Sequence, residues 1–516
     1  MRSTFHGLET ARRGMFTQQT ALQVTGNNIS NANTPGYSRQ RVNFGQTEPY
    51  PAAAINRPQI PGQMGTGVKA ESIQRVRESF LDSQFRGENN KLGYWSSRSE
   101  ALAKMEDIMN EPSDNGLAKT LDRFWQSLQD LSVNPEDSGA RSVVRQRGIA
   151  VVETFNYLSN SLSAIQGDLK TQANHTAGEI NNILKEIDEI NIQIREVEPH
   201  DYLPNDLYDK RDVLVDKLST LVNIEVEKDR LPDKPLTEGQ YKIHLLKADG
   251  TRAATLLDSS TSTINNISIE YGGPNGEASE VKIGTAPALS IKEFSKGQLK
   301  GVLESYGFMN GANAEGTYPK MLAHLDEMAY NFANAFNDVH KAGWSLDSIN
   351  SEPPAHVEYN FFDVSGVTAG KEPLGAAKAI KLHSDLEGKP GLDHIAAAFA
   401  KPGEVGYSGD GSNALNLANV KNDKIFSGSA TLQSYYEGAI GEMAVEAQQA
   451  VRLTQNSFVL TDAVEQRRTS VSGVSLDEEM TNMIQFQHAY NASARNITVI
   501  DEMLDKIING MGVVGR

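Results

Sequence analysis

The sequence predicts a mainly α-helical protein with an inserted β-rich domain, in a nested order of helix, helical bundle, β-rich insert, helical bundle and helix. Three observations support this fold class: a long apolar repeat near the C-terminus, a second repeat near the N-terminus, and a change of composition after residue 223. The 516 residues are enough for roughly two to four domains with a substantial buried core.

The C-terminal repeat occupies residues 476–511. Apolar or aromatic residues fill nine of eleven positions that alternate four and three residues apart, which is the seam of a coiled coil. These positions are Leu476, Met480, Met483, Gln487, Tyr490, Ala494, Ile497, Asp501, Leu504, Ile508 and Met511. Ser475 and Glu478 match a capping box at the start of this helix, and Gly510 and Gly512 fit its end. A helix of this length runs ~54 Å and needs packing partners along all of it.

The N-terminal repeat places Leu8, Met15, Leu22 and Ile29 seven residues apart. Its glycines each weaken a helix by about 1 kcal/mol, so it is expected to need a partner. Residues 1–41 carry five arginines and one glutamate, a net charge of +4, whereas residues 476–516 carry six acidic and three basic residues, a net charge of −3. We therefore expect the two ends to form an antiparallel helix pair, the alternative being that each end packs on the core separately.

The segment between these elements is also patterned. Pro35-Gly36 fits the central positions of a type II turn, and residues 38–70 predict an extended linker with room for one hairpin. Helical patterns follow at 71–131, with breaks at Glu111-Pro112 and Asn134-Pro135, and at 151–197, which is a long bundle helix or a helix with a stutter. Pro199 stops it.

A further helix is expected at 205–222. Alternating strands and the Asp249-Gly250 turn then predict a small β-rich domain at 224–298. Helical patterns return at 318–342 and 432–464, and the residues at 344–424 indicate an α+β region.

Charge and composition argue against several classes of function. A net charge of −17 argues against a general nucleic-acid-binding surface. No apolar run is long enough for a membrane span, and the first fifteen residues lack the apolar core of a secretory signal. Cysteine is absent, which excludes disulfides and thiolate chemistry. The absence fits chance, or a protein that is moved unfolded or assembled outside the cell.

No catalytic site, metal site or cofactor is expected. The ten histidines show no pair at metal-ligand spacing, and the nucleotide-binding and nucleophile motifs are missing. The loop 406–413 lacks the ligand spacing of a calcium site and predicts a turn. Asp477, Glu478 and Glu479 are explained by the dipole at the start of a helix. Matches to N-x-[ST], such as the one at Asn28, are expected by chance.

Apolar residues also lie off the main C-terminal seam. They are Phe486, Ile500, Met503 and Ile507. Two helices cannot cover all of these faces, so lipid, a chaperone or neighbouring subunits must meet them.

Several motifs resemble those of bacterial flagellar proteins. Residues 27–37, with Asn27, Asn28, Asn31, Asn33, Pro35, Gly36 and Tyr37, closely resemble the N-terminal signature of flagellar rod, hook and hook-associated proteins. Residues 475–480 and 485–495 resemble the matching C-terminal signature. The stretch 205–212, the helix through Asn337, His340 and Gly343, and residues 411–415 are similar to the hook-associated family, and most similar to its hook–filament junction member. The resemblance is weak across 224–298 and 345–405.

The resemblance implies a secreted structural subunit of the flagellum with no catalytic role, exported unfolded through the flagellar type III system. Its implied partners are copies of itself, the hook protein, the second hook–filament junction protein and an export chaperone at the C-terminal region, with no nucleic acid and no membrane insertion. The interface expected on the terminal helices comprises Leu8, Met15, Leu22, Ile29, Leu476, Met480, Met483, Phe486, Tyr490, Ala494, Ile497, Ile500, Leu504, Ile508 and Met511.

The implied domains are a terminal coiled coil (1–60 plus 474–516), a helical bundle (61–223, 299–343 and 425–473) and an outer β-rich or α+β domain (224–298 plus 344–424). The main alternative is another long-helix secreted protein, such as an adhesin or a needle-tip protein. An enzyme within 344–424 is a more distant one.

Overall fold

The structure is a computed structural model of the chain and describes residues 4–51, 55, 57, 62–109, 116–230, 232–273, 275–311, 313–367, 373–401, 404–426 and 428–510. The chain divides into two compact units. Unit 1 comprises Met1–Asn90, Glu179–Asn266 and Ser457–Arg516, and unit 2 comprises Lys91–Gly178 and Ile267–Asn456. Three long helices contribute residues to both units: α2 (Ser79–Met109), α4 (Ser138–Val197) and α11 (Leu432–Ser472).

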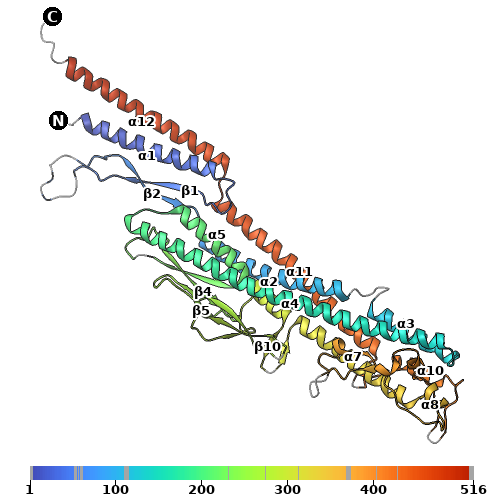
Figure 1. Cartoon of the computed structure of the whole chain (residues 1–516). Coiled ribbons are helices and arrows are strands. Elements are labelled where there is room, and N and C mark those ends of the chain that lie inside the picture. Colours follow the sequence, from blue (N-terminus) through green and yellow to red (C-terminus); the bar gives the residue numbers. More distant parts are fainter. Residues whose placement is uncertain are drawn as a thin grey trace. The chain divides into compact units, whose positions relative to one another are not determined.

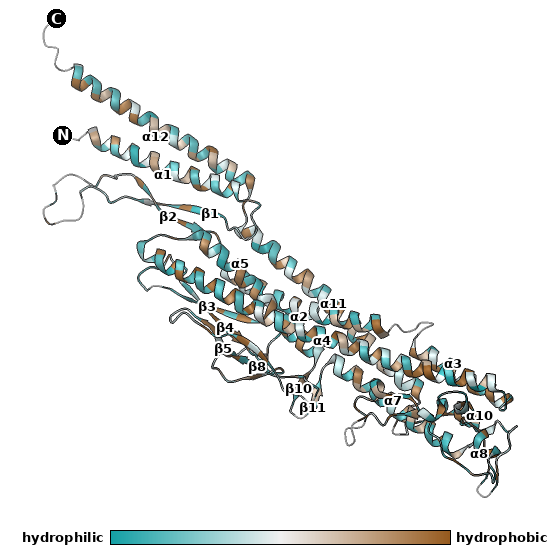
Figure 2. Ribbon diagram, viewed as in Figure 1, coloured by the Kyte–Doolittle hydropathy of each residue, from teal (hydrophilic) through white to brown (hydrophobic). Residues whose placement is uncertain are grey.

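The two terminal helices of unit 1 lie side by side in antiparallel orientation (Figure 1). They are α1 (Thr4–Ser30) and α12 (Leu476–Gly510). The predicted pairing of the chain ends is therefore confirmed. Apolar residues recur along the whole length of α12 (Figure 2), as the repeat in the sequence requires. Met511 and Gly512 lie outside the described residues.

A hairpin follows α1. Strand β1 (Gln40–Gln46) pairs antiparallel with β2 (Val68–Arg75), with Gln40 opposite Arg75. The hairpin for which the linker at 38–70 left room is present, but its second strand continues to Arg75, and the helix expected from residue 71 begins only at Ser79. Residues 68–75 alternate in side-chain direction along β2, and the pairing with β1 satisfies their backbone groups, so the strand continues where a helix was expected.

The rest of unit 1 combines a helix and a sheet. Helix α4 ends at Val197 and the short helix η1 (Glu198–His200) contains Pro199, which confirms the predicted stop. Helix α5 (Asn205–Leu221) leads into a four-stranded antiparallel meander of β3 (Ile224–Asp229), β4 (Gln240–Leu246), β5 (Arg252–Asp258) and β6 (Thr263–Ile264). The predicted Asp249-Gly250 turn joins β4 to β5, and Gly250 has a φ of +83°.

Unit 2 holds the second sheet of the insert. Its strands are β7 (Ile267–Tyr271), β8 (Ala278–Ile283), β9 (Leu289–Ser290), β10 (Phe308–Asn310) and β11 (Asn313–Glu315). Its other helices of eight residues or more are α3 (Leu117–Val133), α6 (Gln298–Tyr306), α7 (Thr317–Ala342) and α10 (Ser412–Asn419). The predicted β-rich character of 224–298 is confirmed, and its strands are shared between the two units.

The remaining part of unit 2 is a region of short elements, as the α+β pattern at 344–424 indicated. They are β12 (Trp344–Ser345), α8 (Leu346–Asn350), β13 (Phe362–Asp363), α9 (Ala376–Ala379), β14 (Lys381–Leu382), η2 (Ser384–Leu386), η3 (Pro390–Leu392), β15 (Ala396–Ala398) and η4 (Val420–Asn422). The core beside them is aromatic: Phe124 packs against Phe332, Phe336, Phe361 and Phe362, with ring centroids 5.3–6.3 Å apart. Within the described residues, no helix is both long and apolar enough to cross a membrane.

Candidate assembly interface and the joint at its base

The turn after α1 starts the site. The N–H of Tyr37 donates to the carbonyl of Thr34 at 3.2 Å and Gly36 has a φ of +80°, so the predicted Pro-Gly turn is confirmed. A Cβ on Gly36 would lie 2.2 Å from a methyl of Val213 on α5. Glycine is therefore required there both for its backbone conformation and for its close approach to α5.

Asn28 ties three elements together at this turn. Its Oδ1 accepts from the hydroxyl of Tyr37 at 2.8 Å and from the N–H of Gln40 at 3.0 Å. Its Nδ2 donates to the carbonyl of Gln40 at 2.8 Å and to Oε2 of Glu479 at 3.1 Å. The side chain is only 1% exposed and all four of its hydrogen-bonding positions are filled. Asn28 thus connects the end of α1 to β1 and to the start of α12.

Arg39 completes the link to α12. Its Nε donates to Oε1 of Glu479 at 2.7 Å and its NH1 group to Oε2 of Glu478 at 2.7 Å. Its backbone N–H donates to the carbonyl of Ser472 at 2.8 Å, at the end of α11. The sequence explained Glu478 and Glu479 by helix capping and dipole alone. That explanation is incomplete, because both carboxylates receive hydrogen bonds from the N-terminal segment.

A buried charge cluster lies next to this turn. The backbone N–H of Ser38 donates to Asp209 at 3.0 Å, and the guanidinium of Arg75 binds Asp209 at 2.6 Å, Asp212 at 3.0 Å and Glu238 at 2.5 Å. We name as the charge cluster Arg75, Arg77, Asp82, Arg86, Asp209, Asp212, Asp216, Glu238 and Arg468. It joins the hairpin, α2, α5, the segment before β4, and α11.

The electrostatics of the charge cluster hold Asp212 and Glu238 ionised, whereas burial raises the pKa of Asp209. Burial alone would raise the pKa of Asp212, but Arg77, Arg75 and Arg86 outweigh it and hold that pKa well below the ordinary value. Glu238 is half-buried, and although its burial would raise its pKa, Arg75 and Lys228 lower it to about 2. Removal of one partner would leave buried arginines without compensating charge, so the cluster is stable only as a whole.

The seam between α1 and α12 has a fixed register. A Cβ on Gly7 would lie 3.2 Å from Ile500, and one on Gly14 would lie 3.1 Å from Ser493. A step of seven residues forward on α1, from Gly7 to Gly14, thus matches a step of seven residues back on α12, from Ile500 to Ser493. A further step of fourteen residues along each helix leads to the Asn28–Glu479 hydrogen bond. This is the heptad geometry of an antiparallel coiled coil. The α1 side of this series is small or polar, with Ala21 fully buried between Gly14 and Asn28.

The structure distinguishes the two series of residues in the predicted seam of α12. The series Met483, Tyr490, Ile497 and Leu504 is half-buried, but the second series is displaced by one residue, from 480, 487, 494, 501 and 508 to 479, 486, 493 and 500. Ile500 and Phe486, expected to stand apart from the seam, contact Gly7 and the ring of Phe44, with ring centroids 6.0 Å apart in the second pair. The polar Glu479 and Ser493 break the apolar pattern, which is why a hydrophobic repeat alone misses their series.

The interface residues expected from the sequence fall into three groups. Half-buried are Leu8, Met15, Leu22, Ile29, Met483, Phe486, Tyr490, Ala494, Ile497, Ile500 and Leu504, and exposed are Leu476, Met480 and Ile508. Met511 is outside the described residues. In the signature turn Asn28 is buried, Asn31 and Tyr37 are half-buried, and Asn27, Asn33, Pro35 and Gly36 are exposed. Met503 and Ile507 are also exposed.

The opposite net charges of the two chain ends produce ion pairs between them only at Arg39, among the residues that the structure describes. Arg12 and Arg13 pair with Glu9 on α1 itself, at 3.0 and 3.1 Å. Between α12 and the described part of residues 1–41, the ion pairs are those of Arg39.

The motifs of unit 2 form a second, separate set of contacts. Asn337 accepts from the N–H groups of Phe361 and Phe362, both at 2.9 Å. The ring of His340 donates from Nδ1 to the carbonyl of Tyr359 at 2.7 Å and accepts at Nε2 from the N–H of Ala396 at 3.1 Å. Burial lowers the pKa of His340 to about 4, so the ring is neutral.

Gly343 belongs to the same set, because a Cβ there would lie 2.1 Å from the amide of Asn413. The amide of Asn413 donates to the carbonyl of Ala396 at 2.8 Å. These residues therefore hold the short elements of unit 2 together, mainly through hydrogen bonds to backbone groups.

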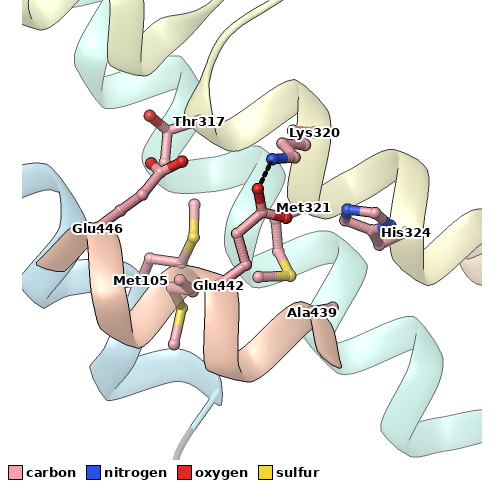
Figure 3. Close-up of a pocket in the computed structure, with 9 residues that line it drawn as sticks. Met105, Thr317, Lys320, Met321, His324, Ala439, Glu442 and Glu446 are labelled. Atoms are coloured by element: carbon pink, nitrogen blue, oxygen red, sulfur yellow. Dashed lines mark hydrogen bonds and ion pairs between the residues drawn. The ribbon is translucent and has the colours of Figure 1, made fainter. Parts of the chain in front are cut away.

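A pocket in unit 2 is lined by methionines and by charged residues. It lies between α2, α7 and α11, and Figure 3 shows Lys320 facing Glu442, with which it forms an ion pair. Met105, Met321 and Met443 also line it. Across the residues that the structure describes, no group of three histidines or acids is placed to hold a metal ion. In the loop 406–413, Asp410 accepts from the N–H groups of Phe399 and Ser412, as expected of a turn.

Comparison with known proteins identifies the class first. The "Flagella basal body rod protein" family matches residues 8–37, and the "Flagellar basal body rod FlgEFG protein C-terminal" family matches residues 465–510. These matches cover most of the paired terminal helices and both of their signatures. Together with the antiparallel pair, they define a flagellar protein of the rod and hook type.

The middle of the chain indicates which family of flagellar proteins it belongs to. Residues 102–353 match the "Flagellar hook-associated protein FlgK helical domain" family. Flagellar hook-associated protein 1 of Bacillus subtilis is 44% identical over 522 residues and covers 100% of both chains. The chain therefore belongs to the flagellar hook-associated protein 1 family.

More distant relatives agree. Flagellar hook-associated protein 1 of Escherichia coli is 23% identical over 569 residues, covering 97% of this chain and 99% of its own. The flagellar hook junction protein FlgK from Burkholderia pseudomallei shares the fold with a TM-score of 0.60 and 14% identity, over 76% of this chain and 100% of that one.

Proposed function

We propose that the charge cluster and the contacts of Asn28 and Arg39, together called the joint, fix the terminal coiled coil to the body of a hook–filament junction subunit. The chain is a structural flagellar protein of the hook-associated type, as its family indicates. The observation that carries the proposal is the convergence of three signature stretches, 27–37, 205–212 and 475–480, on contacts made by Asn28, Asp209 and Glu479. They are far apart in sequence, and the joint is the feature that they share.

The proposed division of labour has three parts. The terminal coiled coil (1–60 plus 474–516) forms the inner wall of a tube, the helical bundle the next shell, and the outer β-rich or α+β domain the outward face. In support, apolar residues on α12 are left exposed, namely Leu476, Met480, Ile484, Val499, Met503, Ile507 and Ile508. Such a surface is typical of a contact with other subunits.

Assembly of such a subunit outside the cell also requires binding partners and an export pathway. We propose that the subunit is exported unfolded through the flagellar type III system and contacts copies of itself, the hook protein and the second junction protein. We further propose that an export chaperone covers the C-terminal region beforehand. The match to rod and hook families at both ends supports a hook contact, and a hook protein of Treponema pallidum, 39% identical over 82 residues, adds to it. No catalytic role is part of the proposal, because the relatives are structural proteins.

Deletion of the gene tests the function. A strain that lacks the chain should build hooks yet release flagellin monomers into the medium, and the unsubstituted gene should restore filaments. Filaments of normal length in the deletion strain would contradict the junction assignment.

Hydrogen exchange tests the state of the subunit before assembly. Because the seam residues are only half-buried, we expect 476–511 to exchange rapidly in dilute monomer and slowly in the assembled junction. Strong protection in the monomer would show that assembly does not order these helices.

A further inference from the structure

A groove runs between α1 and the hairpin in unit 1. Arg13, Phe16, Thr17 and Thr20 line one side and Thr47, Val68, Lys69 and Ala70 the other, around a volume of about 300 Å³. Thr17 donates to the carbonyl of Val68 at 3.2 Å and Arg13 to that of Thr66 at 3.3 Å, and these contacts hold the hairpin against the helix. The ring of Phe16 is 54% exposed beside the groove.

The lining chemistry favours an acidic, apolar peptide segment. The groove walls carry two cations, Arg13 and Lys69, and no acid, although Glu9 outside the groove binds Arg13 at 3.1 Å. The volume is at the lower end of the range for small-molecule sites and suits a few apolar side chains. An amphipathic helix end with apolar residues beside acids is the matching occupant.

The far end of α12 has that composition. The register places residue 500 opposite Gly7, and α1 begins at Thr4, so residues beyond about 503 have no opposite residue among the described part of α1. Met503, Ile507 and Ile508 are exposed there, Ile508 by 71%. Three acids, Asp501, Glu502 and Asp505, accompany one Lys506.

The groove cannot be filled by the same chain's own end of α12. Phe16 and Thr17 lie at the level of residues 490 and 491 in the observed register. Residue 507 is therefore sixteen or more residues farther along a continuous helix, or ~25 Å away at about 1.5 Å per residue. An α12 end that fills the groove therefore comes from a second copy of the chain.

We propose that the groove between α1 and β2 receives the 501–508 end of α12 from a neighbouring copy of this chain. This inference rests on the proposed function, since it needs copies to assemble side by side. It specifies one of their contacts: apolar residues of the helix end cover Phe16, and Asp501 and Asp505 face Arg13 and Lys69.

Engineered cysteines test the contact directly, because the chain has none of its own. Cells producing a Thr20→Cys chain together with an Ile508→Cys chain are oxidised, and purified junctions are run on a non-reducing gel. A crosslinked dimer is expected in the mixture. The matched control replaces Thr20→Cys by Ser30→Cys, which is exposed on the same helix but ten residues, or ~15 Å, farther along.

The outcomes separate the two proposals. If the unsubstituted chain does not enter the junction, the proposed function fails. If both cysteine chains enter the junction without a crosslink, or crosslink equally through Ser30→Cys, the groove assignment is wrong and the proposed function stands.

Charge reversal gives an independent readout. Arg13→Glu with Lys69→Glu should lower incorporation about five- to tenfold, the size expected for two exposed ion pairs. Adding Asp501→Lys and Asp505→Lys to the same chain should restore it, because every groove then meets a reversed helix end. Failure of the fourfold variant to recover, with its circular dichroism unchanged, would overturn the assignment.

Discussion

Replacement of Asp212 by asparagine is the sharpest test of the charge cluster. The carboxylate is 2% exposed and faces Arg75 at 3.0 Å, Arg77 at 3.2 Å and Arg86 at 3.3 Å. Asparagine keeps the shape but removes the charge that compensates these guanidinium groups. Breaking a buried ion pair from one side costs ~3–5 kcal/mol, a large share of the stability of a typical domain.

Two probes can localise the loss. Hydrogen exchange should accelerate in α5 and in the hairpin of unit 1. All three tryptophans, Trp95, Trp125 and Trp344, belong to unit 2, so their fluorescence reports that unit. Glu225→Gln is the matched control in unit 1, because its carboxylate is exposed and pairs with Arg252 at the surface, where such a pair contributes less than about 1 kcal/mol. An Asp212→Asn effect no larger than the control's would refute the reasoning.

The pH dependence provides a second check on the same cluster. The folded pKa values of Asp212 and Glu238 lie below their ordinary values of 3.8 and 4.5, so the unfolded chain binds more protons in between. The stabilisation is therefore fully present above about pH 5 and is lost as the pH falls toward 2. Asp212→Asn should flatten this part of the stability profile, and an unchanged acid limb would count against the ionised cluster.

Three further predictions concern other parts of the chain. Glu479→Gln removes charge from a buried acceptor and should weaken the joint by about 1.5–3 kcal/mol, lowering incorporation into purified junctions at least tenfold, whereas exposed Glu478→Gln should incorporate normally. The pKa of His340 is about 4 in the folded chain against an ordinary 6.5, so the stability that its neutral ring contributes is complete above pH 6.5 and is lost toward pH 4. This loss should reach ~3 kcal/mol in unfolding curves followed by tryptophan fluorescence. A stability that does not change over that pH range would contradict a buried neutral ring. Ile497→Asp or Leu504→Asp should block assembly yet leave tryptophan fluorescence unchanged, and unfolding of unit 2 by either change would disprove the separation of roles.

The elements of the fold could be predicted from the sequence wherever they depend on a repeat or on a local turn motif. The pairing of α1 with α12, the hairpin, the Pro35-Gly36 turn and residues 151–197 of α4 follow from spacing and turn chemistry, whereas the first thirteen residues of α4, from Ser138, were not predicted. Prediction from the sequence fails where the buried residues are polar or charged. Glu479 reads as a capping residue, and only the distant Asn28 and Arg39 make its burial favourable.

The charge cluster was hidden for the same reason. Its arginines and acids come from four separate parts of the sequence, at 75–86, 209–216, 238 and 468, and each part alone resembles an ordinary solvated surface. The stretch 205–212 was singled out by its resemblance to a family motif, but nothing local indicates that Asp212 is buried among arginines. A useful signal in comparable sequences is a dense run of charges inside a motif, such as Asp209, Arg211 and Asp212, on a helix that also carries core residues.

The contact between Asn28 and Glu479 spans 451 residues of chain. Contacts of such separation close late, because the loop entropy must be overcome before they contribute. Unit 2 can therefore complete its core while the two ends are still apart. A subunit truncated before residue 476 would retain that core but leave Asn28 and Arg39 without their carboxylate. The contacts of Asn28 and Arg39 with α12 therefore form only after the chain has been made as far as Glu479, so a chain that ends before this residue lacks them.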